Sequence, residues 1–127
     1  MDELYELYQR GSALLADGHH HQAVVPLRRA RDLSPQSASI REALGRALFH
    51  TQRYEEAAGE FRALSEQGPT NDYALFCLGR CLQMLGRHAE ARAPLTMASR
   101  LQPHRTDYEL YLARSTEVSS AASDTPD

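Results

Sequence analysis

Three arginines recur at a spacing of 34 residues, at Arg46, Arg80 and Arg114. A guanidinium is a planar cation that binds carboxylates through paired hydrogen bonds, so this series predicts a site for acidic groups. On stacked helices, neighbouring charges would stand on the order of 10 Å apart. Two interpretations stay open, because the arginines either bind a ligand or form ordinary solvated surface. Glu42 and Glu117 lie about one turn from Arg46 and Arg114 and favour the second, whereas Arg80 has no acidic neighbour on its own helix.

Aromatic side chains accompany these arginines on the same helices. Aromatic residues beside arginine are typical of the positions that dominate binding at protein interfaces. Part of the set, Tyr5 and Tyr73 above all, is equally explained by packing between neighbouring helices. The aromatic residues near the arginine face are Tyr5, Tyr8, Phe49, Tyr73, Phe76 and Tyr111.

Two other groups of residues carry side chains suited to metal or redox chemistry. His19, His20 and His21 are consecutive, so their imidazoles point in different directions and a closed metal site needs further ligands. Cys77 and Cys81 share a helix face, but no second pair or nearby histidine completes a zinc set. We find no glycine-rich phosphate loop, nucleophile elbow or paired-carboxylate motif in the sequence. We therefore expect no cofactor, no resident metal and no enzymatic activity, with a metal-binding protein as the least favoured alternative.

The spacing of the arginines is also the period of the small residues and the prolines. A period of this length indicates one supersecondary unit stacked on copies of itself. The glycines and alanines allow two helices to approach closely, and the prolines mark the turn to the next unit. The nine positions that repeat are Gly11, Gly45, Gly79, Ala23, Ala57, Ala91, Pro35, Pro69 and Pro103.

Apolar residues at helical spacing predict three pairs of helices and one single last helix. The pairs fill repeats at about 4–37, 38–71 and 72–105, with helices at about 3–16, 20–32, 36–50, 54–66, 72–86 and 88–100. The last helix, about 105–117, is expected to face inward through Tyr108, Leu112 and Ala113 and to cover the end of the stack. Residues 1–118 then form one domain. We expect 119–127 to be a disordered tail because this segment has too little apolar surface for a core.

The composition limits the classes of partner. The chain has 127 residues, 42% of them hydrophobic and 24% charged, and all its basic residues are arginine. A net charge of −3 argues against sequence-independent binding of nucleic acid. No apolar run is long enough to predict a membrane span and no signal peptide is recognisable, so we expect no membrane partner and a cytoplasmic location.

The repeat strongly resembles the tetratricopeptide repeat, in which Leu-Gly, large apolar residues, Ala and Pro recur at fixed spacings. Two positions depart from that pattern. Arg41 replaces the first large apolar residue of the second unit, and Arg10 replaces the leucine before the glycine of the first. We expect both to loosen local packing. The third unit shows the pattern most fully, as Leu75, Leu78-Gly79, Leu82, Ala91, Leu95 and Pro103.

This resemblance covers about residues 4–117. It implies an all-α fold, a right-handed α-α superhelix of three helical hairpins plus a capping helix. In that family the first helix of each unit lines a concave groove that holds a peptide or a partner segment. The implied function is a protein–protein interaction module or scaffold whose ligand is acidic or aromatic. The implied groove residues are Tyr5, Tyr8, Ser12, Arg46, Phe49, Tyr73, Phe76, Arg80, Tyr111 and Arg114.

The best-known site of that family, a clamp for the acidic C-terminus of chaperones, uses lysine and asparagine in the groove. The matching places hold Tyr8, Ser12, Ala43, Tyr73 and Cys77, so the resemblance does not extend to a co-chaperone role of that kind. A second interpretation of the same fold is a structural homodimer, in which one copy buries the groove of the other.

Overall fold

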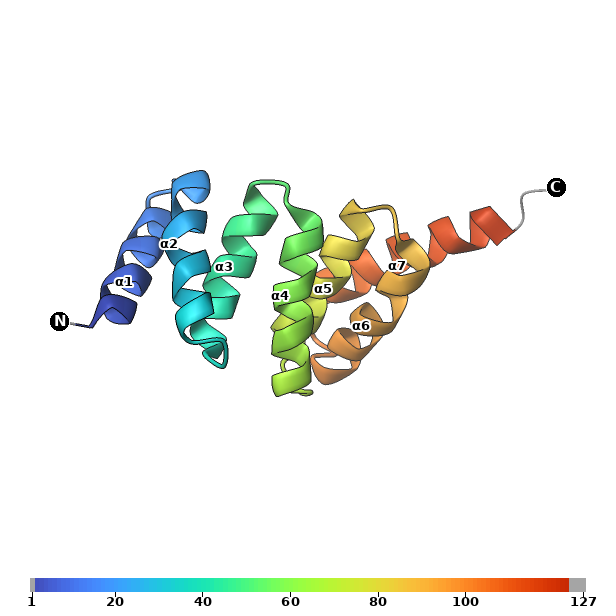
Figure 1. The fold of residues 1–127 in the computed structure, drawn as a ribbon. Coiled ribbons are helices and arrows are strands. Elements are labelled where there is room, and N and C mark those ends of the chain that lie inside the picture. Colours follow the sequence, from blue (N-terminus) through green and yellow to red (C-terminus); the bar gives the residue numbers. More distant parts are fainter. Residues whose placement is uncertain (1, 124–127) are drawn as a thin grey trace.

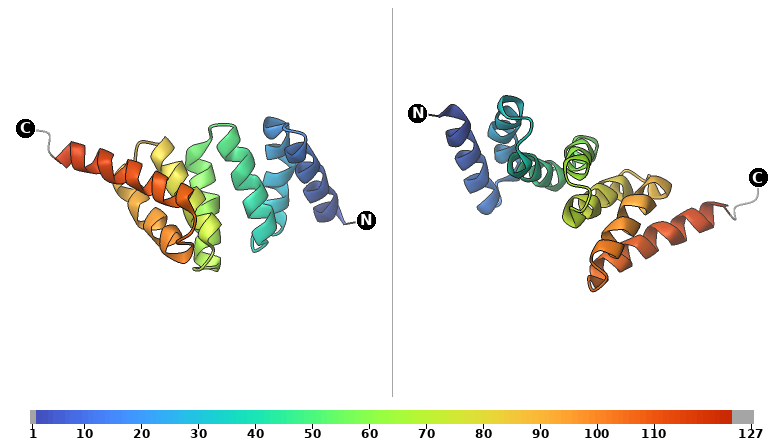
Figure 2. Two further views of the ribbon diagram at one scale, coloured as in Figure 1. Left: turned by 180° about the vertical axis from the view of Figure 1, so that it is seen from behind. Right: turned by 90° about the horizontal axis from the view of Figure 1, so that it is seen from below.

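The computed structural model describes residues 2–123, which form seven α-helices, and the side chains of 119–123 are not described. Three antiparallel helix pairs follow one another along the chain, and a single helix ends the stack (Figure 1). Two further views show the pairs side by side in chain order (Figure 2). The expected all-α solenoid is confirmed. The helices are α1 Glu3–Ala16, α2 His20–Leu33, α3 Ala38–His50, α4 Tyr54–Gln67, α5 Asp72–Met84, α6 His88–Leu101 and α7 Thr106–Ser123.

The first helix of each pair starts at a polar cap. The side chains of Asp2, Ser37 and Asn71 accept hydrogen bonds from backbone N–H groups two or three residues later, at 3.0, 3.4 and 3.0 Å. Each bond satisfies one of the amides that a helix start leaves without a partner. The second helices, α2, α4 and α6, have no side-chain cap. Their position therefore depends on the tight turn before them and on packing against the first helix.

A close contact at one glycine in each pair sets how near the two helices lie. A Cβ atom added at Gly45 in α3 would lie 2.8 Å from Cζ of Phe61 in α4, and Phe61 is 1% exposed. Gly11 and Gly79 meet Leu27 and Leu95 in the same way. Only a residue without a side chain fits at such a distance, so the 34-residue period of the glycines reflects a packing requirement repeated in each hairpin.

The turns inside the three hairpins share one backbone conformation. Gly18, Gln52 and Gly86 have φ values of 81°, 64° and 78° and are 34 residues apart. This left-handed region is strained for a residue with a Cβ atom. An added Cβ at Gly18 or Gly86 would meet no atom within 4 Å, so the strain there is conformational and not steric contact with the fold.

We expect Gln52→Gly to raise the free energy of unfolding by about 1 kcal/mol, because glycine adopts this conformation without strain. The Gln52 side chain is exposed, so no packing is lost. Gly86→Ala should lower stability by a similar amount for the same reason. Urea denaturation followed by circular dichroism measures both. A Gln52→Gly protein less stable than the parent would contradict the assignment of strain to this turn.

Arg41 does not loosen the second repeat, so that prediction is wrong. Its Nη1 donates to Oε2 of Glu60 at 2.6 Å, and its Nε donates to the backbone oxygen of Pro35 at 2.7 Å. Arg31 of α2 bonds the other oxygen of Glu60, whose side chain is 4% exposed. A buried carboxylate of α4 thus joins α2 and α3, and the polar residue at this core position is compensated. Arg10, the other departure, is exposed.

The last helix differs from expectation in its orientation and length. Tyr108 is fully buried as predicted, and its hydroxyl donates to Oδ2 of Asp72 at 2.7 Å. Ala113 is exposed, however, and Ser115 takes the buried place one half-turn on. The helix also runs to Ser123, because each residue added to a helix already formed gains a backbone hydrogen bond without a new nucleation cost. Of the predicted tail, 119–123 is therefore helical and 124–127 lies outside the described residues.

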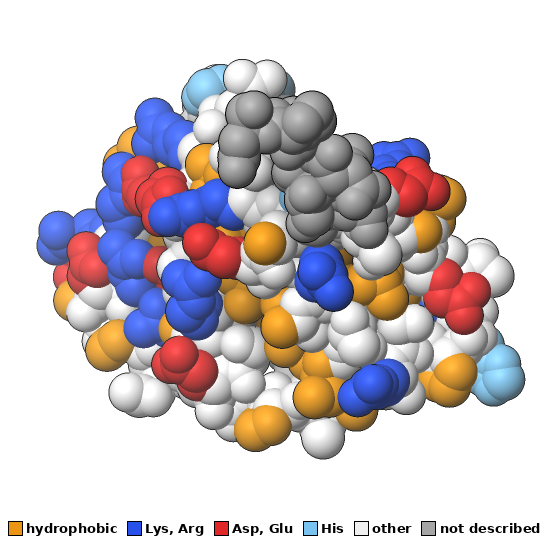
Figure 3. Space-filling view, turned by 90° about the vertical axis from the view of Figure 1, so that its right-hand side faces the viewer, with side chains coloured by type: hydrophobic (Ala, Val, Ile, Leu, Met, Phe, Trp, Pro, Cys, Tyr) orange, Lys and Arg blue, Asp and Glu red, His pale blue; other side chains and the backbone are white. Residues whose placement is uncertain are grey.

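Charged side chains on the surface connect neighbouring hairpins. Seen from the α7 end, arginines and acidic residues intermingle over one flank (Figure 3). Arg28 pairs with Glu56 at 2.9 Å and Arg87 with Glu55 at 3.2 Å, in each case between two hairpins. Across residues 2–123 we find no helix long and apolar enough to cross a membrane.

Candidate functional site

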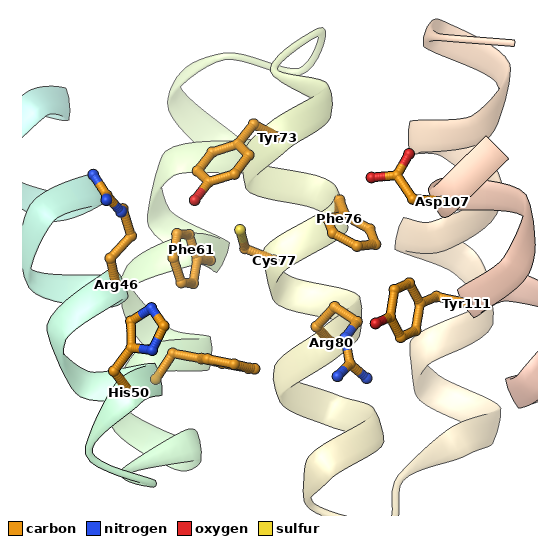
Figure 4. A pocket seen from close by; sticks show the side chains of 10 residues that line it. Arg46, His50, Phe61, Tyr73, Phe76, Cys77, Arg80, Asp107 and Tyr111 are labelled. Atoms are coloured by element: carbon orange, nitrogen blue, oxygen red, sulfur yellow. The ribbon is translucent and has the colours of Figure 1, made fainter. Parts of the chain in front are cut away.

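The first helices of the second and third hairpins and the capping helix enclose a pocket of about 450 Å³, which we call the aromatic pocket (Figure 4). Most of its lining comes from α3, α5 and α7, and α4 contributes one ring at its base. Six of the predicted groove residues meet here. The lining residues are Arg46, Phe49, His50, Phe61, Tyr73, Phe76, Cys77, Arg80, Asp107 and Tyr111.

The aromatic side chains of this pocket hold one another in place. Phe76 stacks on Tyr108 with ring centroids 4.6 Å apart and lies 5.5 Å from the ring of Tyr111. On the other side Phe61 meets Tyr73 edge-on at 6.4 Å. Aromatic pairs prefer such offset and edge-on arrangements, which restrict ring motion. The pocket is therefore formed before any ligand enters it, and a ligand would order few side chains on binding.

Arg80 is held against the pocket wall and does not project freely into solvent. Its guanidinium lies 4.0 Å from the centroid of the Tyr111 ring, and its Nη1 donates to Oε1 of Gln83 at 2.8 Å. Arg114 lies 4.5 Å from the same ring. Gln83 also donates to the backbone oxygen of Tyr111 at 2.7 Å, which ties α5 to α7. Two of the three repeated arginines thus contact one tyrosine through cation–π interactions.

The third arginine of the series, Arg46, is exposed at the pocket mouth. Within residues 2–118, whose side chains are described, it forms no ion pair with Glu42, and Arg114 forms none with Glu117. Glu42, which favoured the interpretation of Arg46 as ordinary solvated surface, therefore does not pair with it. The Arg46 guanidinium remains available to bind a ligand. Of the three arginines, it is the one whose guanidinium no described interaction restrains.

Other titratable groups contribute little charge to the pocket. Arg105 donates two hydrogen bonds to Asp107, at 3.0 and 2.7 Å, which lowers the pKa of that carboxyl and compensates its charge. Burial raises the pKa of Cys77 to about 12 and also raises that of Tyr73, so both stay protonated at neutral pH. Burial, His20 and Arg46 lower the pKa of His50, which favours its neutral form. The pocket is apolar with net positive charge from its arginines.

The N-terminal part of the groove forms a second, smaller pocket of about 270 Å³ between α1 and α3, which we call the polar pocket. Tyr8 and Ser12 line it together with Arg46, which also borders the aromatic pocket. Tyr5 lies in neither pocket, is 59% exposed and accepts a hydrogen bond from Gln9 at 2.7 Å. Its membership of the groove is therefore not supported by the geometry. The remaining lining residues are Leu15, Ala16, Ser39, Glu42 and Ala43.

Four residues of the aromatic pocket were absent from the predicted set: His50, Phe61, Cys77 and Asp107. Phe61 belongs to a second helix, and the repeat pattern assigns it to packing against Gly45. His50 stacks on His20 of the histidine cluster, with ring centroids 4.3 Å apart and planes at 19°. Among the described residues, no three His, Cys, Asp or Glu side chains gather as a metal site requires.

Stacked helical hairpins with a groove along their first helices define the class of α-solenoid repeat proteins, whose concave faces are binding surfaces. The tetratricopeptide repeat model matches residues 8–72, and a second model of the same repeat matches 61–93. The chain belongs to the tetratricopeptide repeat family.

Similar proteins include a curated relative and several solved structures. Superkiller complex protein 3 of Mus musculus is 35% identical over 85 residues, 67% of this chain but 5% of that protein. The structure of MamA from Desulfovibrio magneticus RS-1 has a TM-score of 0.86 at 21% identity and covers 92% of this chain and 66% of that one. The first repeat domain of Spaghetti (RPAP3), bound to the HSP90 peptide SRMEEVD, has a TM-score of 0.83 at 14% identity, with 93% and 94% covered. These two structures show likeness of fold.

Proposed function

We propose that the groove binds an extended segment of a partner protein, with an apolar or aromatic side chain in the aromatic pocket and an acidic group at Arg46. The observation that supports this most directly is the pocket itself, a preformed aromatic cavity with Arg46 at its mouth, whose guanidinium forms no ion pair with the described side chains. Its volume of about 450 Å³ falls in the range of small-ligand sites, and its few polar groups converge from three helices.

The division of roles follows from the physical chemistry of the lining. Full burial of a phenylalanine side chain contributes roughly 2–3 kcal/mol, and this term needs no partner of opposite charge. The arginine at the mouth then adds selectivity for acidic neighbours and faster association.

The Spaghetti (RPAP3) domain, which has this fold, was solved bound to the HSP90 peptide SRMEEVD, and this supports a peptide ligand for the present groove. The lysines and asparagines expected of a chaperone clamp are replaced here, with Tyr73 and Cys77 on the aromatic pocket and Tyr8 and Ser12 on the polar one. We therefore propose a ligand whose apolar side chain supplies most of the affinity, and not one held through its terminal carboxylate.

We expect Arg46→Glu to weaken binding of a labelled nonapeptide, one phenylalanine flanked by glutamates, about tenfold. The reversed charge repels the glutamates, whereas we expect folding to be unaffected because Arg46 is exposed and makes no ion pair with the described side chains. Fluorescence anisotropy at low salt measures the affinity. Arg92→Glu is the matched control, since Arg92 is an exposed arginine of α6 outside both pockets. Equal affinity of the Arg46→Glu protein and the parent would exclude Arg46 from the site.

The alternative, a homodimer that buries the groove, makes a different prediction for the same protein. Self-association through the aromatic pocket would increase the mass measured by light scattering with concentration, and the peptide would reverse it. A constant monomer mass together with peptide binding supports the interaction module, whereas a dimer insensitive to peptide places the contact elsewhere.

A further inference from the structure

The polar pocket differs from the aromatic pocket in what it offers a ligand. Its lining contains a phenol, two hydroxyls, a carboxylate and a guanidinium, at Tyr8, Ser12, Ser39, Glu42 and Arg46. Because Arg46 lines both pockets, the two are consecutive parts of one groove that runs from α1 across α3 to α5 and α7. A ligand that crosses α3 from the aromatic pocket therefore reaches the polar pocket next.

Two features show unused hydrogen-bonding capacity in the polar pocket. The hydroxyl oxygen of Ser12 is buried and has no hydrogen-bond partner among the described residues. A buried polar atom without a partner is unfavourable, so a group that bonds it is favoured. Glu42 and Arg46 have opposite charges one helical turn apart, yet the described part of the chain contains no ion pair between them. Ser39, in contrast, has the hydroxyl of Ser37 at 3.3 Å.

The chemistry of these three groups selects the ligand group. A cation would bond Glu42 but meet Arg46, and an anion would bond Arg46 but meet Glu42. An apolar side chain would leave the Ser12 hydroxyl unpartnered. A carboxamide has one acceptor and two donors and no charge, so it accepts from Arg46 or Ser12 while it donates to Glu42. Arg46 has five donors, which allows it to serve an acidic group at the aromatic pocket at the same time.

We infer that the polar pocket is a second subsite that takes an asparagine or glutamine side chain of the same ligand. This inference rests on the proposed function, because it assumes that a peptide occupies the groove. Neighbouring first helices of the stack lie on the order of 10 Å apart. An extended chain advances about 3.3 Å per residue, so the carboxamide residue stands about three positions from the apolar anchor.

The test uses the full chain and labelled nonapeptides that carry one phenylalanine, adjacent glutamates and an asparagine three positions from the phenylalanine. A second peptide has alanine in place of the asparagine, and both are made with the asparagine before and after the anchor. In the better orientation, we expect the change from asparagine to alanine to weaken binding to the parent protein about fivefold, the value of one or two hydrogen bonds. Moving the asparagine to one or two positions from the anchor should have the same effect.

Protein variants then locate the interaction. In Ser12→Ala and Glu42→Ala proteins, the change from asparagine to alanine in the peptide should alter affinity by less than about twofold, since the partner is gone. Ser12→Ala should not lower the melting temperature, because it removes a buried polar atom that has no bond to lose. Loss of the asparagine effect at an unchanged melting temperature shows that Ser12 acts in binding and not in stabilising the fold. Glu66→Ala is the control, an exposed glutamate of α4 outside both pockets.

The outcomes distinguish this inference from the proposed function. If the peptides bind but the asparagine contributes equally in parent and variant proteins, or contributes nothing, the second subsite is wrong and the aromatic pocket stands. If neither peptide binds the parent protein in the anisotropy titration, the proposed function fails and this inference fails with it.

Discussion

Replacing Gly45 with alanine is expected to destabilise the protein by about 2 kcal/mol, which corresponds to a fall of about 8 °C in melting temperature. The added Cβ would lie 2.8 Å from Cζ of Phe61, whose ring is 1% exposed, so the ring or the helix must shift. Either α3 and α4 separate, or Phe61 leaves its preferred rotamer. Both cost packing energy that exceeds the gain of about 1 kcal/mol in helix propensity. Thermal unfolding followed by circular dichroism at 222 nm measures the change.

Gly59→Ala is the matched control for this prediction. Gly59 is an exposed residue inside α4, and a Cβ added there meets nothing within 4 Å. The same substitution should therefore stabilise the protein by about 0.5–1 kcal/mol. Both substitutions gain a similar amount of helix propensity. The difference of about 3 kcal/mol between their effects on the free energy of unfolding therefore measures the cost of disturbing the contact between α3 and α4. Similar effects of the two substitutions would show that the hairpins do not approach as closely as described.

Glu60→Ala is expected to lower the free energy of unfolding by about 2 kcal/mol. The carboxylate is 4% exposed and pairs with Arg31 and Arg41, which lie on two different helices. Its removal leaves two guanidiniums close together without their shared anion. Because these arginine side chains are 25% and 18% exposed, water partly replaces the lost partner, and the loss is smaller than for a fully buried pair. Urea denaturation at low and high salt should give similar losses, since buried pairs are weakly screened.

Glu56→Ala provides the comparison for Glu60. Glu56 lies on the same helix and also pairs with an arginine of α2, Arg28 at 2.9 Å, but its side chain is 51% exposed. An exposed pair contributes little after solvent screening, so we expect a change below about 0.5 kcal/mol. A loss at Glu56 as large as the loss at Glu60 would contradict the importance of burial for this contact.

The fold was predictable because the close contact between the two helices of each hairpin restricts one position of the first helix to glycine. Only glycine fits opposite Phe61, so Gly45 recurs with the repeat and can be recognised without a structure. The contact between Glu60 and Arg41 could not be predicted in this way. It occurs at one junction, between residues 19 apart, and has no counterpart at the repeat spacing. From the sequence alone, Arg41 was expected to loosen the packing of the second repeat. In the structure its charge is compensated by Glu60 of α4.

The candidate site was predictable in part, for a related reason. Periodicity shows which residues share a helix face, and six of the predicted residues line the aromatic pocket. It does not show how a side chain turns on that face. Arg80 and Arg114 therefore appeared equivalent to Arg46, although both pack against the Tyr111 ring. Ala113 was misplaced because the last helix lacks a second helix to fix which face is buried.

One wall of the aromatic pocket, Tyr111, comes from the terminal helix α7, whose described neighbours are α6 and α5. A helix with few neighbours exchanges its amide hydrogens through local opening at low free-energy cost. Opening of α7 removes the wall and with it the cavity. Occupancy of the groove and closure of the terminal helix are therefore thermodynamically linked, and a bound segment slows hydrogen exchange in α7 in proportion to its affinity.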